Sequence, residues 1–256
     1  MTRILSIANQ KGGVGKTTTA VNLATAMAAT KKKVLLIDLD PQGNAGTGVG
    51  YQRGAQNKTI YDVLRRGAPL AAAVHPTAIP GLSLVPSTES LAGAEIELVS
   101  ALEREQVLKR ALQNNGFDYV FIDCPPALGL LTLNALVASE GVLVPLQCEY
   151  YALEGLSQLL RTIDIVQQNL NTNLALEGVV LTMVDHRNRL SVQVEKDVRT
   201  HLKEKVFQTT IPRNVRVSEA PSFGKPAMIY DFRCAGAQAY IRLASELIRK
   251  EEKVSI

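Results

Sequence analysis

The chain has 256 residues, of which 46% are hydrophobic and 20% are charged, and its formal net charge at pH 7 is +4. This size allows one large core, and no run approaches the roughly 18 apolar residues that a membrane-spanning helix needs. The three cysteines stand far apart without metal-ligand spacing, which argues against a disulfide scaffold and fits the reducing cytoplasm. Strand-like sequence begins almost at once, so we expect no signal peptide.

The first stretch of the chain predicts a strand, a glycine-rich loop and a helix. Residues 4–8 form a short apolar run, residues 12–15 are rich in glycine, and Lys16 opens a segment with helical spacing. Strand, glycine loop, Lys-Thr and helix are the context that a phosphate-binding loop needs. The apolar face of the expected helix consists of Ala20, Leu23, Ala24 and Met27.

The residue types of this loop suit nucleotide phosphates. Glycines let the backbone turn its N–H groups inward, and the helix N-terminus adds partial positive charge. Lys16 is expected to reach the β- and γ-phosphates, and the Thr17 hydroxyl to hold Mg²⁺. The expected nucleotide-binding set is Lys11, Gly12, Gly13, Val14, Gly15, Lys16, Thr17 and Thr18.

The loop departs from the usual G-x-x-x-x-G-K-[ST] pattern at its start. Gln10 stands where a glycine is expected, and Lys11 follows it. A lysine on the outside of the loop is poorly placed for its own nucleotide, but it could reach the phosphates of a facing subunit, as an arginine finger does in trans. Lys11 therefore suggests a dimer with ATP between its subunits. The alternative is that Lys11 is a solvated loop lysine.

Two further strands are expected to end in carboxylates. Residues 34–38 read as a strand buried on both faces, with Asp38 and Asp40 at its carboxyl end. Residues 119–123 read as another such strand and end in Asp123, which is expected to hold Mg²⁺ through its water shell. Carboxyl ends of strands face the ligand in open α/β sheets, so these aspartates should lie near the glycine loop.

The rest of the chain alternates between predicted strands and helices. This alternation predicts a doubly wound α/β fold, with a mostly parallel sheet flanked by helices and one domain over residues 1–256. The further expected strands are residues 82–85, 142–146, 177–184 and 206–211; the helices are 59–67, opened by a capping box, 98–114, 130–138, 153–170, 191–203 and 235–250; and the loops are 46–57 and 218–226.

Positive charge gathers in the C-terminal part of the chain. Residues 187–250 contain 13 Lys/Arg and 6 Asp/Glu, a net charge of +7, which leaves −3 for the remainder. Such a distribution is compatible with a nucleic-acid-binding surface and equally with ordinary solvated helix faces.

Five blocks together resemble the ParA/Soj-type chromosome-partitioning ATPases, a P-loop group that also contains MinD and the nitrogenase iron protein. The blocks span the chain: KGGVGKTT at 11–18, DLDPQGN at 38–44, FIDCPP at 121–126, LQCEYYALEGL at 146–156 and IPRNVRVSEAP at 211–221.

The resemblance implies a role for each matching residue. Gly12 would lie at a dimer interface, and Lys11 would contact phosphate across it. Asp40 would orient the attacking water, while Asp38 and Asp123 would serve the Mg²⁺ site. The adenine would lie among Pro212, Arg213 and Asn214, and Arg187 and Arg216 would belong to a surface that binds double-stranded DNA without sequence preference.

The resemblance also implies a function. We expect an ATP hydrolase, weak alone, that dimerises on ATP and binds the nucleoid in the cytoplasm. A ParB-type centromere-binding protein would stimulate it during chromosome segregation. A membrane-bound MinD-like role is disfavoured because the tail carries Glu251 and Glu252 and has little apolar face. An iron-protein role is disfavoured because Cys124 and Cys148 do not match that protein's cluster cysteines.

Three alternatives remain open. The first is a ParA-like ATPase that positions a plasmid or a protein cargo, which would share the chemistry and differ in its partner. The second is a filament-forming scaffold protein, which no sequence feature favours. The third is a metabolic P-loop enzyme such as a synthetase, and the basic C-terminal third counts against it.

Overall fold

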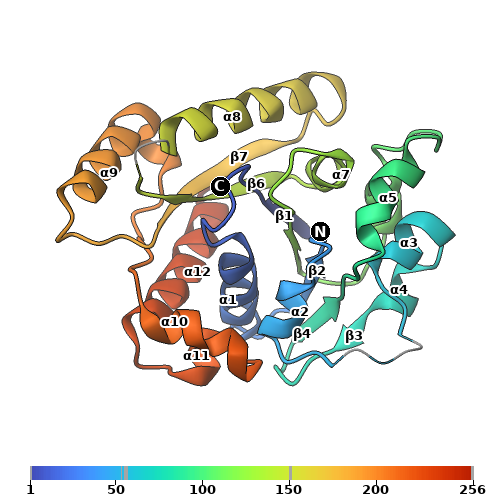
Figure 1. The fold of residues 1–256 in the computed structure, drawn as a ribbon, viewed down its shortest axis with the longest axis horizontal. Helices are drawn as coiled ribbons and strands as arrows, with labels where there is room; N and C mark the ends of the chain where they lie inside the picture. The colour runs from blue at the N-terminus through green and yellow to red at the C-terminus, as the bar shows by residue number, and fades with distance from the viewer. Residues whose placement is uncertain (1, 53, 55–56, 150–151, 255–256) are drawn as a thin grey trace.

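The computed structural model describes residues 2–52, 54, 57–149 and 152–254, and its centre is a seven-stranded sheet (Figure 1). The strands lie in the order β3-β4-β2-β5-β1-β6-β7, and all neighbours are parallel except β3 and β4. This confirms the predicted doubly wound α/β class. The strands are β1 (Arg3–Ile7), β2 (Val34–Asp38), β3 (His75–Pro76), β4 (Leu82–Val85), β5 (Tyr119–Asp123), β6 (Gly141–Gln147) and β7 (Ala175–Thr182).

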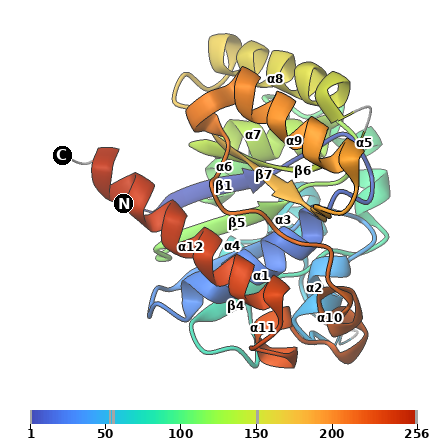
Figure 2. The ribbon, with the colours of Figure 1, turned by 90° about the vertical axis from the view of Figure 1, so that its left-hand side faces the viewer.

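The strand sequences explain why helices cover both faces of the sheet. On β2, Leu35 and Ile37 pack into one apolar cluster, while Val34 and Leu36 pack into the other. Figure 2 shows α8 and α9 on one side of the sheet and α1 and α12 on the other. The helices are α1 (Lys16–Ala28), α2 (Asn44–Gly48), α3 (Ile60–Arg66), α4 (Leu70–Ala73), α5 (Leu91–Leu98), α6 (Val107–Ala111), α7 (Leu130–Ala138), α8 (Ala152–Asn169), α9 (Arg189–Leu202), α10 (Val215–Glu219), α11 (Ala227–Tyr230) and α12 (Ala235–Val254).

The register of the parallel strands determines where the polar residues meet. Asp38 at the end of β2 pairs in register with Asp123 at the end of β5, and Asp123 pairs in register with Ile7 at the end of β1. The loop that follows β1 therefore starts beside Asp123, with Asp38 one strand further along the sheet. The expectation that the aspartates lie near the glycine loop is confirmed.

The expected helix over residues 98–114 is wrong. Helix α5 ends at Leu98, α6 begins at Val107, and Glu103 between them has a left-handed φ of 48°. Val99 and Leu102 are 58% and 88% exposed, so a continuous helix would have had no apolar surface to pack against here. The short helix from residue 59 is confirmed: the Asp62 carboxylate accepts the Thr59 N–H at 3.0 Å, and left-handed Gly67 ends the helix.

The expected loop over residues 46–57 is wrong at its start, where α2 forms because the buried Asp38 carboxylate accepts two of its backbone N–H groups. Arg53, Ala55 and Gln56 lie outside the described residues, as do Tyr150 and Tyr151 of the fourth sequence block and Ser255 and Ile256 of the tail.

Two predictions near the C-terminus also differ from the structure. The expected strand over residues 206–211 is not continuous: Val206 makes an isolated bridge to Val179, and the N–H groups of Phe207 and Ile211 donate to the Val179 and Leu181 carbonyls of β7. The expected loop over residues 218–226 contains the end of α10 and a 3₁₀ turn, Ala220–Phe223. Among the described residues, no helix is long and apolar enough to span a membrane.

Candidate nucleotide and magnesium site

The glycine loop between β1 and α1 has the conformation that its sequence requires. Gly13 and Gly15 have φ angles of 76° and 90°, in the left-handed region that favours glycine. Gly15 immediately precedes α1, so the positive end of that helix opens into the loop. The loop is therefore shaped to surround an anion with backbone N–H groups.

Lys16 lies inside this loop. The residue is 7% exposed, and its Nζ donates to the carbonyl oxygen of Lys11 at 3.0 Å. Burial lowers the pKa of its ammonium, and the nearby Asp123 acts in the opposite direction. Phosphate oxygens would give this desolvated cation stronger hydrogen bonds than the carbonyl it now contacts.

Asp38 and Asp123 form a pair of fully buried carboxylates at the adjacent ends of β2 and β5. Burial raises the pKa of both groups; the Asp38 carboxylate raises the pKa of Asp123 further, and the Asp40 carboxylate raises that of Asp38. Asp38 is well supplied with hydrogen bonds: it accepts from the N–H groups of Ala45 at 2.9 Å, Gly46 at 3.2 Å and Asp40 at 3.1 Å. Its main structural effect is to hold α2.

Asp123 is different, because neither of its carboxylate oxygens has a well-formed hydrogen bond although both are buried. The Thr17 hydroxyl is close enough to favour its charged form. A buried carboxylate costs free energy unless it meets a cation or donors. Carboxylate and hydroxyl oxygens are ligands that Mg²⁺ accepts, commonly through retained water. Asp123 and Thr17 therefore fit a magnesium ion, with Asp38 beside them.

Asp40 begins the segment that leads from β2 into α2. Its carboxylate accepts the backbone N–H of Gln42 at 3.0 Å, and its own N–H donates to Asp38. The side chain thus stands next to the carboxylate pair without belonging to it. The role of Asp40 in orienting the attacking water stays a prediction.

Lys11 does not lie in its own loop. Its Nζ forms an ion pair with Glu149, which follows β6, and the two side chains are 41% and 46% exposed. The sequence did not single out Glu149, since one acid in a polar turn gives no signal. The geometry agrees with a lysine that faces outward, away from the phosphates that Lys16 would bind.

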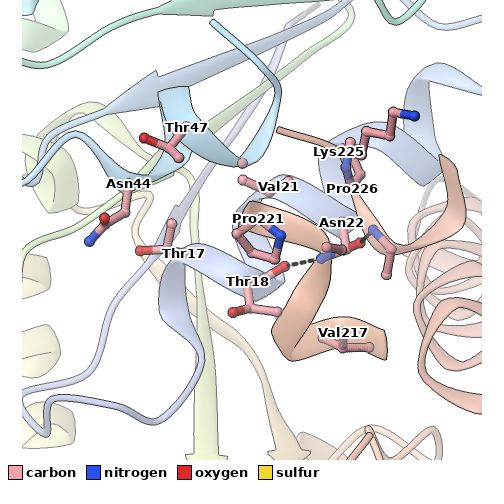
Figure 3. A pocket seen from close by; sticks show the side chains of 13 residues that line it. Thr17, Thr18, Val21, Asn22, Asn44, Thr47, Val217, Pro221, Lys225 and Pro226 are labelled. Carbon is pink, nitrogen blue, oxygen red and sulfur yellow. Dashed lines mark hydrogen bonds between the residues drawn. The ribbon is translucent and has the colours of Figure 1, made fainter. Parts of the chain in front are cut away.

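A cavity of about 250 Å³ opens beside the loop, between α1, α2 and the segment from α10 to α11 (Figure 3). Thr17 and Thr18 line one side of it, and Val217 and Pro221 line another. The residues expected around the adenine are not among its lining: Pro212 bridges to Val184, and the Asn214 side chain caps α10. The adenine assignment of Pro212, Arg213 and Asn214 stays a prediction.

The two arginines expected to contact DNA both carry acidic partners. Arg187 is 90% exposed and binds Asp185 through two bonds of 2.9 Å. Arg216 lies 3.1 Å from Glu219 and 3.7 Å from Asp231. The charge that these arginines offer to a ligand is therefore partly balanced in the isolated chain.

We predict that Asp123→Asn removes the Mg²⁺ dependence of nucleotide binding. The wild type should bind ADP more than about tenfold more tightly with Mg²⁺ than with EDTA, since the metal links a buried carboxylate to the phosphates. Calorimetric titration in both buffers measures this. Asp62→Asn, in a capping box away from the loop, is the matched control and should keep the dependence; an equally Mg²⁺-dependent Asp123→Asn protein would contradict the assignment.

We also predict that Glu149→Gln favours dimerisation with ATP. The substitution frees Lys11 from its ion pair, and an exposed pair of this kind changes an equilibrium by about twofold to fivefold. Sedimentation velocity with a non-hydrolysable ATP analogue measures the dimer fraction. Glu154→Gln, on the nearby first turn of α8, should leave that fraction unchanged. A decrease in dimer with Glu149→Gln would show that Glu149 has another role.

Comparison with known proteins places the chain in a family. The profile of the AAA domain family matches residues 2–176. The chain is 56% identical to the chromosome partitioning protein ParA of Caulobacter vibrioides, covering 97% of this chain and 95% of that protein. It is 53% identical to the sporulation initiation inhibitor protein Soj of Bacillus subtilis, covering 96% and 98%.

A solved structure from Mycobacterium smegmatis, named cobyrinic acid a,c-diamide synthase with bound ADP and magnesium, is 40% identical to the chain. It superimposes with a TM-score of 0.86 and covers 98% of this chain and 96% of that one. The chain is more than half identical to ParA and to Soj over nearly its whole length, and it has a lysine-containing glycine loop with carboxylates beside it. These findings identify the chain as a member of the ParA/Soj family of P-loop ATPases.

Proposed function

We propose that this protein is an ATP- and Mg²⁺-dependent ATPase that dimerises on ATP, binds DNA without sequence preference and segregates chromosomes with a ParB-type partner. The observation that carries the proposal is the pair of lysines. Lys16 lies inside the loop, while Lys11 lies outside it and contacts Glu149. One chain thus offers a complete phosphate site and one cation directed elsewhere, as an active site shared between two subunits requires.

The residues at the site have different roles in hydrolysis. Loop N–H groups and Lys16 bind the phosphates, and Thr17 and Asp123 hold Mg²⁺, which would neutralise charge on the transferred phosphoryl group. Asp40 is accessible enough to orient water. Within the described part of the chain, the Asp40 carboxylate accepts a hydrogen bond from the Gln42 N–H and none from a histidine, so Asp40 is placed to orient rather than strongly activate water. Slow hydrolysis by the protein alone follows from this weak activation.

Dimerisation would control DNA binding through avidity. Each subunit offers Arg187 and Arg216, but Asp185, Glu219 and Asp231 compete with DNA phosphates for them. One subunit therefore has weak affinity for DNA. Two subunits joined by ATP double the phosphate contacts, so binding becomes tight in the ATP state and is lost after hydrolysis. A ParB-type partner that stimulates hydrolysis would release the protein from the nucleoid.

Two alternatives to chromosome segregation differ from it in partner or in reaction. A ParA-like protein for a plasmid or protein cargo would have the same site, and its partner would differ. The 40% identity to a protein named as a diamide synthase favours a metabolic alternative. Retention on DNA with and without ATP, over a salt series, distinguishes the metabolic alternative from the ParA-like ones, because a synthase has no need of ATP-dependent DNA binding.

We predict that Asp40→Ala traps the ATP dimer on DNA. Loss of the water-orienting carboxylate should slow phosphate release by about a hundredfold while ATP binding persists. Phosphate release and DNA retention are measured on the same preparation. The exposed Asp164 on α8 supplies the control Asp164→Ala. A wild-type rate of hydrolysis in Asp40→Ala would remove Asp40 from the mechanism.

We predict opposite effects for Arg216→Glu and Glu219→Gln. The first removes a phosphate contact from each subunit, so the slope of log affinity against log salt should fall by about two per dimer. The second removes a competing carboxylate and should strengthen DNA binding. Arg161→Glu on α8, across the sheet, is the matched control (Figure 2). Unchanged DNA retention in Arg216→Glu at low salt would contradict the assignment.

A further inference from the structure

The end of β7 connects the phosphate loop to the segment after Ile211 through three consecutive residues. Thr182 contacts the loop, Met183 turns the chain, and Val184 pairs with the neighbouring segment. None of the three was expected from the sequence to take part in the site.

Thr182 makes a buried hydrogen bond to the phosphate loop. The residue is 2% exposed, and its hydroxyl donates to the carbonyl oxygen of Val14 at 2.8 Å. Val14 is 1% exposed, so water has little access to satisfy this carbonyl. The backbone of the phosphate loop at Val14 is therefore held by a side chain of β7. The conformation of the loop depends in part on Thr182, which is 168 positions away in the sequence.

This bond also determines the direction of an N–H group. In a trans peptide the C=O and the following N–H point in opposite directions. With the Val14 oxygen held by Thr182, the Gly15 N–H lies antiparallel to that C=O in the same peptide plane and points away from Thr182. Gly15 itself has a left-handed φ of 90°, which turns the chain into α1 directly after this peptide.

Met183 has a conformation that its side chain disfavours. Its φ of 52° is left-handed, which is costly for a residue other than glycine. A Cβ added to Gly15 would lie 3.9 Å from the Met183 methyl group and from the Thr182 methyl group. The turn therefore brings two side chains to the foot of the loop.

Val184 then fixes the segment on which the adenine is expected. Its N–H donates to the Ile211 carbonyl at 3.0 Å, and its own carbonyl accepts the Arg213 N–H at 3.2 Å. The turn at Met183 thus lies between the two ends of the expected nucleotide site. A shift of this turn would move both ends together.

We propose that Thr182 and Met183 are positioning residues for the nucleotide: Thr182 orients the Gly15 N–H towards the phosphates, and the left-handed turn at Met183 holds the phosphate loop and the segment 211–213 in one register. The inference rests on the ATP-binding part of the proposed function and is independent of DNA or partner binding.

Thr182→Val tests the first half, because valine keeps the shape and removes the donor. Val14 loses its partner and the peptide can rotate, so the Kd for Mg·ATP and Mg·ADP should rise about tenfold. The KM should rise with it while kcat at saturation stays near wild type, since the contact is made equally in the ground and transition states. Thr182→Ser keeps the hydroxyl and should bind within about twofold of wild type.

Thr25→Val is the matched control. Thr25 is 1% exposed, and its hydroxyl donates to the Val21 carbonyl at 2.7 Å within α1, away from the loop. It loses the same kind of buried bond and should lower the melting temperature without changing the Kd for nucleotide. If Thr182→Val lowers the melting temperature but binds nucleotide as wild type does, its role is structural only and the inference is overturned.

Substitutions at Met183 test the second half. Met183→Gly accepts the left-handed turn and should keep the wild-type Kd, whereas the β-branched Met183→Val cannot adopt it easily and should bind nucleotide about tenfold more weakly. Calorimetry with Mg·ADP on folded protein measures both. Equal affinities for Met183→Val and wild type would overturn the turn's role, and failure of the wild type to bind Mg·ADP would instead overturn the proposed ATPase.

Discussion

The burial of two carboxylates side by side is the constraint on which the site depends. Asp38 and Asp123 end neighbouring parallel strands and are withdrawn completely from water. Asp38 is satisfied by the backbone of α2, so α2 forms where the sequence suggested a loop. Both carboxylate oxygens of Asp123 are buried without a well-formed hydrogen bond, and a cation could stabilise them. One carboxylate thus shapes the protein, and the other is available for the ligand.

The same pair of carboxylates would connect nucleotide binding to the conformation of α2. Asp40 is joined to Asp38 through its backbone N–H, and α2 lines the cavity beside Thr17. A magnesium ion at Asp123 would change the field at Asp38, and any response there reaches Asp40 and α2 directly. Asp40, the residue expected to orient the attacking water, is therefore one hydrogen bond away from Asp38, which lies beside the expected metal ligand Asp123.

The sequence predicted those features that depend on local pattern. The buried strands before Asp38 and Asp123 are continuous apolar runs, and their end points follow from the first charged residue. The helix beyond Leu98 was wrong because its pattern is helical but no other element covers Val99 and Leu102. Glu149, Thr182 and Met183 were missed because their roles arise from contacts between distant segments. The position of Thr182 at the end of a strand does not indicate that its hydroxyl donates to the Val14 carbonyl.

The lysine pair shows how one loop can serve two purposes. Lys16 is desolvated and hydrogen-bonded to the loop itself, so phosphate can replace a weak partner with a strong one. Lys11 is half-exposed and held by Glu149, an ion pair that costs little to break. Binding within one subunit should therefore be strong and come first, while the proposed contact across subunits would be readily made and lost. A dimer that must separate after each round of hydrolysis would need this difference in strength.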